Sequence, residues 1–211
     1  MSTIARRRSG MDYENFIFDT LPRQGEWTEE EYLSLTDATN RMVEFTDGVL
    51  EVLPMPTDRH QSILKYLFLA LNAFLDPRGG VVQFAVLRLQ LRPGKIREPD
   101  LLALLDAEDV RRQDRFWTGA DLLVEVVSKD KPSRDLVQKK REYAKAGIPE
   151  YWIVDPQQES VIVYRLQGKR YVRHGLFRRG QRATSALLPD FSVNVTDLFN
   201  AARQTRRKHK S

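Results

Sequence analysis

The sequence contains no cysteine among its 211 residues. Disulfide bridges, zinc–thiolate sites and cysteine nucleophiles are therefore excluded for this chain, and we expect a location in the reducing cytoplasm. Long apolar runs are also missing, because Lys65 interrupts the longest one, residues 63–75, which is too short to span a bilayer. We therefore expect no membrane segment. We also expect no secretory signal, because no apolar run follows the arginines at residues 6–8.

Acidic residues are absent from one long segment, residues 160–189. The chain as a whole is basic because of residues 203–211, and without them it has 29 basic and 29 acidic residues. A segment with charges of one sign attracts polyanions, so we predict a nucleic-acid-binding surface here. The alternative is a solvated hairpin face without a partner. The basic residues of the predicted surface are Arg165, Lys169, Arg170, Arg173, Arg178, Arg179 and Arg182.

The length suits one domain with a proper core. We predict a flexible N-terminal arm over residues 1–25, a single domain over residues 26–200 and a disordered basic tail over residues 201–211.

Local signals predict the first elements of this domain. Thr28 and Glu31 form a capping-box pattern that predicts a short helix. Asp47-Gly48 between two apolar runs predicts a β-hairpin. Thr57 can cap a helix that ends near Leu75, and this helix is apolar almost all round, which predicts burial between layers.

The later elements follow from alternation, apolar runs and turn residues. Residues 81–91 alternate and predict one strand, and residues 99–105 and 121–128 predict two more. Pro132-Ser133 predicts the start of a helix that ends near Gly147. Further strands are expected at residues 151–154, 161–166 and 171–173. The predicted fold class is therefore α/β (α+β), a mixed central sheet flanked by helices.

Two carboxylates stand out as candidate metal ligands. Glu125 lies within a strand rich in leucine and valine, where a carboxylate must be paired, protonated or bound to a cation. Asp100 follows Pro99 at the start of another apolar run. Carboxylates on adjacent strands, roughly 4.8 Å apart, can share one ion, and such an oxygen site suits Mg²⁺ or Mn²⁺. The alternative is that each acid makes a salt bridge at a strand end.

Several motifs together resemble those of a known family. They are Val43-Glu44, Asp47-Gly48, Arg59-His60, Pro99-Asp100, residues 121–128, the four-residue spacing of Asp135, Lys139 and Tyr143, and residues 147–156. From about Thr28 to Phe199 the chain resembles the Uma-two family of restriction endonucleases, a bacterial domain of unknown function within the PD-(D/E)XK nuclease superfamily. The Glu125 strand and residues 150–156 are specific, whereas a bare Pro-Asp is not.

The resemblance implies a restriction-endonuclease-like core in which Asp100, Glu125 and the main-chain carbonyl of Val126 hold a metal ion. The superfamily pattern places a lysine two residues after the glutamate, but Val127 occupies that position here. We predict that Lys139 supplies the missing positive charge, because Asp135, Lys139 and Tyr143 share one helix face. Lys129 is the alternative, and an ion pair between Lys139 and Asp135 is the structural alternative.

Two further residues have less certain roles in the sequence. Glu44 occupies the first acidic position of the family and is a candidate for a second metal or an activated water, or else an ordinary hairpin residue. His60 could contact phosphate, but we interpret it as a helix cap or a packed neighbour. The sequence thus predicts a Mg²⁺- or Mn²⁺-dependent endonuclease acting on double-stranded DNA, with a homodimer expected by analogy. The first rival hypothesis is a nuclease-fold protein that binds nucleic acid without cleaving it. The others are a structural or partner-binding domain whose acids only make salt bridges, and a metal hydrolase that acts on small phosphoesters.

Overall fold

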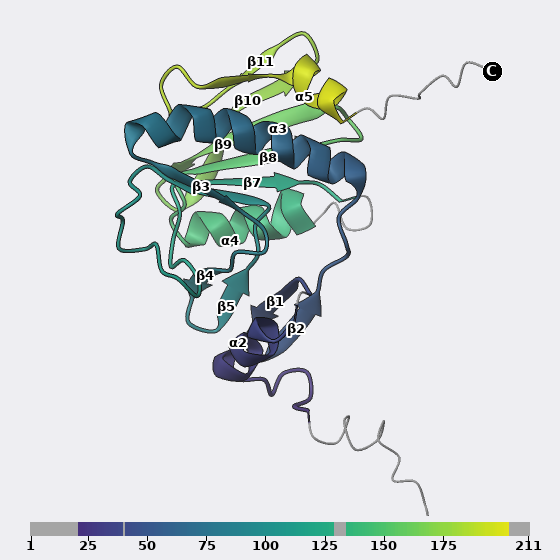
Figure 1. The fold of residues 1–211 in the computed structure, drawn as a ribbon, viewed down its shortest axis with the longest axis vertical. Helices are drawn as coiled ribbons and strands as arrows, with labels where there is room; N and C mark the ends of the chain where they lie inside the picture. The colour runs from purple at the N-terminus through teal and green to yellow at the C-terminus, as the bar shows by residue number, and fades with distance from the viewer. Residues whose placement is uncertain (1–20, 40, 129–133, 203–211) are drawn as a thin grey trace, which may run out of the picture.

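The computed structural model describes residues 21–39, 41–128 and 134–202. Within these residues a six-stranded mixed sheet forms the centre of the molecule (Figure 1). In spatial order its strands are β10 (Arg170–Arg178), β9 (Ser160–Gln167), β8 (Glu150–Asp155), β7 (Leu122–Val126), β6 (Leu101–Leu104) and β3 (Val81–Phe84). Neighbouring strands are antiparallel except β7 and β8, which are parallel. The predicted mixed central sheet is confirmed.

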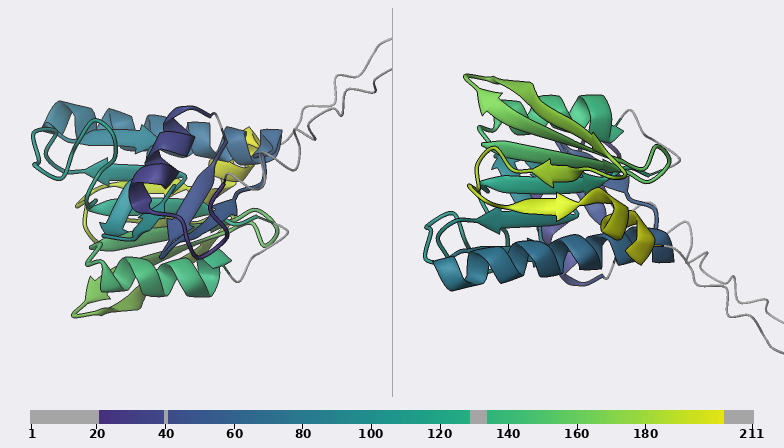
Figure 2. Two further views of the ribbon diagram at one scale, coloured as in Figure 1. Left: turned by 90° about the horizontal axis from the view of Figure 1, so that it is seen from below. Right: turned by 90° about the horizontal axis from the view of Figure 1, so that it is seen from above.

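Helices cover both faces of this sheet, as both views in Figure 2 show. On one face lie α3 (Asp58–Leu75) and α5 (Val195–Ala201), which share a core with Val124 of β7. On the other face lies α4 (Lys140–Lys145), whose Tyr143 packs in a second core with Leu123. Because side chains alternate along a strand, Glu125 points to the same side as Leu123, toward α4.

A smaller four-stranded sheet lies beside the central one, at the lower end of Figure 1. Its strands are β2 (Val49–Val52), β1 (Val43–Thr46), β5 (Lys95–Arg97) and β4 (Leu89–Arg92). The helix α2 (Glu29–Asp37) packs on it through Tyr32, whose ring stacks on Phe45. A third, two-stranded sheet joins β11 (Arg182–Thr184) and β12 (Ser192–Asn194).

The local signals near the N-terminus produce the elements they predict. Thr28 and Glu31 form the complete capping box of α2. Asp47 and Gly48 have φ angles of 46° and 85°, as a two-residue hairpin turn requires, and they join β1 to β2. The first twenty residues of the predicted arm and residues 203–211 of the predicted tail lie outside the described residues. Gly25, the last residue of the arm, donates its N–H to the carbonyl of Gly48 at 2.7 Å.

Two predictions about these elements are wrong. Residues 81–91 form two strands in different sheets, since β3 pairs with β6 and β4 pairs with β5. The helix α3 is not buried on all sides, because it covers only one sheet face and leaves Leu69 56% exposed.

The chain between β7 and α4 carries residues that matter for the site. Arg134–Lys139 form a π-helical turn, η2, that leads directly into α4, and this helix ends before Gly147 as predicted. Its predicted start at Pro132-Ser133 lies outside the described residues. No helix in the described part of the chain is both long and apolar enough to cross a bilayer.

Candidate active site

A pocket of about 500 Å³ opens where the two larger sheets, α3 and η2 meet. Its wall brings together residues that are far apart in the sequence. The chemically active side chains in that wall are His60, Glu98, Asp100, Glu125, Arg134 and Lys139. Asp100 and Glu125 therefore line one pocket, and their role as metal ligands stays a prediction.

The pairing of β6 with β7 places these two carboxylates side by side. Leu101 pairs with Val124, so Asp100 and Glu125 lie one residue beyond that pair on neighbouring strands. The backbone N–H of Val126 donates to Asp100 Oδ2 at 2.7 Å, which anchors the aspartate side chain against β7. The main chain at Val126 thus lies at the pocket, next to both acids.

Glu125 is buried, with 3% of its surface exposed, and two side chains of the following helix contact it. Lys139 Nζ lies 2.8 Å from Glu125 Oε1, and the Tyr143 hydroxyl donates to the same oxygen at 2.6 Å. Burial raises the pKa of Tyr143 well above its ordinary value, and the nearby Glu125 charge adds to the effect. The tyrosine therefore stays a hydrogen-bond donor, and Lys139 provides the compensating charge.

Lys139 thus takes the place that the missing strand lysine would fill. Val127, two residues after Glu125, is buried in the core on the α4 side. Lys139 reaches the glutamate from η2 instead, because the helix packs on that same face. The side chain of Asp135 and the alternative lysine, Lys129, lie outside the described residues.

Glu44 lies on the other side of Lys139, on β1. Its Oε1 is 3.4 Å from Lys139 Nζ, its Oε2 is 3.4 Å from Arg97 Nε, and Arg134 also contacts Oε2. Burial by itself would raise the pKa of Glu44, but the charges of Lys139, Arg97 and Arg134 together outweigh burial and lower it. Glu44 is therefore ionised and already surrounded by cations.

Glu98 is a buried acid that the sequence analysis did not single out. It lies two residues before Asp100, and its Oε2 has no hydrogen-bond partner among the described residues. Burial, reinforced by the Glu44 charge, raises the pKa of Glu98 to about 8. At neutral pH this side chain is therefore mainly protonated. The sequence analysis made no prediction for Glu98, which lies just before the strand expected at residues 99–105.

Two further residues of the pocket wall, His60 and Arg134, were not predicted from the sequence to belong to the site. Thr57, not His60, caps α3, because its hydroxyl accepts the His60 backbone N–H at 3.2 Å. The His60 ring faces the pocket instead, with Nε2 3.2 Å from Asp100 Oδ2. The motif Arg59-His60 was visible, but only the packing of α3 against β6 brings the ring to Asp100. Arg134 gave no signal in the sequence.

Comparisons with known proteins identify a family and a similar fold. The Uma2 family, described as "Putative restriction endonuclease", matches residues 29–196. The chain belongs to this family. A solved structure from Anabaena variabilis, described as "a putative nuclease belonging to DUF820", has a similar fold, with a TM-score of 0.65 and 21% sequence identity. The match covers 84% of this chain and 99% of that one. No curated protein matches this chain.

The donor atoms of this Uma2 pocket fit a hard divalent cation. Asp100 uses Oδ2 for the contacts with Val126 and His60, and its Oδ1 accepts no hydrogen bond from the described residues. No cluster of three His, Cys, Asp or Glu side chains suited to a metal exists within the described residues. Mg²⁺, however, is commonly held by one or two carboxylates and completes its coordination with water. The two acids are therefore a donor set compatible with Mg²⁺ or Mn²⁺, and metal binding stays a prediction.

The basic segment predicted to bind nucleic acid is not part of this pocket. Four of its seven residues belong to β9 and β10, and β10 is the edge strand of the central sheet. The edge is three strand spacings, roughly 14 Å, from β7. Arg179 forms an ion pair with Glu159, and Arg182 donates to Ser192. None of the seven residues contributes to the described pocket wall, and their role in nucleic-acid binding stays a prediction.

Proposed function

We propose that this Uma2-family chain is a metal-dependent endonuclease that hydrolyses phosphodiester bonds of double-stranded DNA. The observation that carries the proposal is the convergence of Asp100, Glu125 and Lys139 in one pocket. Two carboxylates and one ammonium group are what such hydrolysis needs. The carboxylates hold a cation beside the phosphate, and the ammonium group stabilises negative charge as it develops.

Each residue has a distinct role in this proposal. Asp100 and Glu125, with the Val126 carbonyl, would hold Mg²⁺ or Mn²⁺, which supplies Lewis-acid activation of the phosphate and the attacking water. Val126 N–H and His60 orient Asp100 through Oδ2 and leave Oδ1 for the ion. Tyr143 holds Glu125 at 2.6 Å, so that its carboxylate keeps one direction.

Lys139 is proposed to face the phosphate as the electrostatic partner of the reaction. Hydrolysis forms a bond between a water oxygen and phosphorus and breaks the bond to the leaving oxygen, with negative charge building on the phosphoryl oxygens. Glu44 is proposed to position Lys139 rather than to bind a second metal, because three cationic side chains already compensate its charge.

The test is Mg²⁺-dependent nicking of supercoiled plasmid by the Asp100→Asn variant. We expect a loss of at least about 10³-fold in cleavage rate, because the ligand loses its charge but keeps its shape. Asp114→Asn is the matched control, since it removes the same charge from an exposed loop. Calorimetry with Mn²⁺ should show binding to the parent and weaker binding to Asp100→Asn. Parental cleavage by Asp100→Asn would overturn the proposal, and binding without cleavage by the parent would favour the inactive, nucleic-acid-binding alternative.

A further inference from the structure

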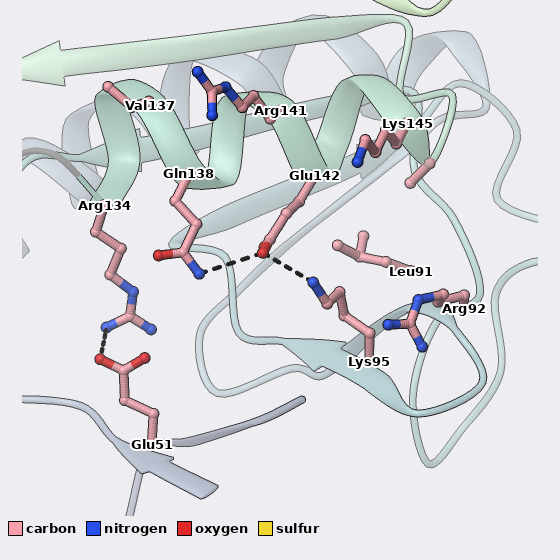
Figure 3. A pocket seen from close by; sticks show the side chains of 11 residues that line it. Glu51, Leu91, Arg92, Lys95, Arg134, Val137, Gln138, Arg141, Glu142 and Lys145 are labelled. Carbon is pink, nitrogen blue, oxygen red and sulfur yellow. Dashed lines mark hydrogen bonds and ion pairs between the residues drawn. The ribbon is translucent and has the colours of Figure 1, made fainter. Parts of the chain in front are cut away.

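A second cavity adjoins the candidate active site on the side of α4. Its volume is about 810 Å³, and it lies between the helix formed by η2 and α4 and the facing strands β4 and β5. Figure 3 shows Arg134, Arg141 and Lys145 along the helix, with Arg92 and Lys95 across from them. We call this cavity the α4 cleft.

The helix presents its cationic residues on one face. Arg134, Gln138, Arg141 and Lys145 recur at spacings of four, three and four residues, which places them on one side of a helix. Arg141 and Lys145 are exposed and lie roughly 6 Å apart along the helix axis. Lys139 and Tyr143 lie on a different side of the same helix and contact Glu125.

The charge of the α4 cleft is positive. Its described wall contains five cationic side chains and two carboxylates, Glu51 and Glu142. Both carboxylates are already engaged: Arg134 lies 3.2 Å from Glu51, and Glu142 accepts from Lys95 and Arg97. Arg141 and Lys145 form no ion pair within the part of the chain that the structure describes. They are therefore available to an anionic partner.

The α4 cleft meets the active-site pocket at Arg134. This arginine lines both cavities and contacts Glu44 on one side and Glu51 on the other. A polyanion in the α4 cleft would therefore reach the pocket that contains Asp100 and Glu125. The basic residues of β9 and β10 do not meet the pocket in this way, because they lie toward the far edge of the sheet.

We propose that the α4 cleft binds the phosphate backbone of the DNA duplex next to the scissile phosphate. The proposal rests on the nuclease function proposed above and adds the surface that holds the substrate. Arg141 and Lys145 contact successive phosphates, with Arg134 at the entrance to the active site. Such contacts fix the position of the substrate without reading its sequence.

The experiment measures binding of a fluorescent 20-base-pair duplex by anisotropy, in EDTA and over a range of NaCl concentrations. The variant is the double substitution Arg141→Gln and Lys145→Gln. The matched control is Lys169→Gln with Arg170→Gln, which removes two exposed positive charges from the β9–β10 hairpin. Each lost phosphate contact lowers the slope of log K against log salt by about 0.9. The cleft variant should therefore lose about 1.8 from this slope and at least about tenfold in affinity, while the control keeps the parental slope.

A gain-of-charge variant keeps the proposal testable if the double variant folds poorly. Gln138→Lys adds a cation between Arg134 and Arg141 and should steepen the salt slope by about 0.9. Three outcomes would each overturn the proposal. They are a parental salt slope in both cleft variants, a loss of salt slope in the hairpin control alone, and no binding of the duplex by the parent.

The cleavage assay separates this proposal from the nuclease function itself. The double cleft variant should raise KM and leave kcat near the parental value, because it removes binding that is equal in the ground and transition states. Asp100→Asn should lose kcat and keep the parental salt slope. If Asp100→Asn still cleaves DNA at the parental rate, the proposed function is wrong. The anisotropy data then still test whether the α4 cleft binds the duplex.

Discussion

Two glutamates on neighbouring parallel strands, Glu125 on β7 and Glu150 on β8, are both buried among apolar residues. Their surroundings differ in kind. Among the described residues, Glu150 accepts hydrogen bonds only from uncharged donors: Trp152 Nε1, the Ser185 hydroxyl and two backbone N–H groups. Glu125 lines a pocket and contacts the Lys139 ammonium group.

We interpret this difference as that between a structural carboxylate and one with the proposed catalytic role. The donors of Glu150 include the loop that follows β11, at Ala186 and Leu187, so the glutamate ties that loop to the sheet. Hydrogen bonds of 2.6 to 2.7 Å satisfy its oxygens, and it is not part of the wall of the candidate active site. A buried acid in an apolar strand therefore indicates function only when a cation and a cavity accompany it.

The largest expected effect comes from comparing Glu125→Gln with Glu150→Gln. Glu125→Gln should lower plasmid cleavage by about 10³-fold, because it removes a metal-ligand charge. Glu150→Gln should keep cleavage within a few-fold but destabilise the fold by about 2–3 kcal/mol, because an amide NH₂ group would face backbone donors. Cleavage rates below the melting transition and urea unfolding measure the two effects. The reverse pattern, with Glu150 controlling cleavage, would contradict the comparison.

The second effect concerns the cation beside Glu125. Lys139→Met should reduce kcat by about 10²-fold and change KM much less, because a charge-stabilising group acts chiefly in the transition state. Lys140→Met is the matched control, since the neighbouring Lys140 lies over the Tyr164 ring instead of in the pocket. Steady-state cleavage of a short duplex measures both constants. Equal losses in the two variants would mean that Lys139 has no special role.

The smallest effect is on stability and concerns Glu98, whose Oε2 has no hydrogen-bond partner among the described residues. The pKa of Glu98 in the folded protein is about 8, above its ordinary value of 4.5, so the folded state binds the proton more tightly. Stability contributed by the protonated form is therefore lost as pH rises from about 4.5 through about 8. The glutamine of Glu98→Gln cannot ionise. Relative to the parent, the free energy of unfolding of this variant should therefore increase by on the order of 1–3 kcal/mol between pH 5 and pH 9.

Thermal or urea unfolding in EDTA at several pH values measures this gain. The exposed Glu108→Gln serves as the control and should follow the parental pH dependence. A Glu98→Gln variant with the same pH dependence as the parent would show that Glu98 ionises normally in the folded protein.

Short-range chemistry made parts of the fold predictable. The capping box at Thr28, the Asp47-Gly48 turn and the Thr57 cap each depend on neighbouring residues, and each forms as expected. The error at residues 81–91 has the opposite cause. Alternation reports only which side chains share a face, and it contains no information that β3 pairs with β6 while β4 pairs with β5.

The sequence by itself determined the two acids of the site and the candidate lysine, because a carboxylate in an apolar strand and a lysine one turn before Tyr143 are local patterns. Only the tertiary structure decided which groups meet. The contact of His60 with Asp100 spans 40 residues, and that of Arg134 with Glu44 spans 90. Such contacts depend on how helices pack against sheets. The protonation of Glu98 and the position of the α4 cleft depend on the same packing, because burial and the distance between charges are set only in the folded chain.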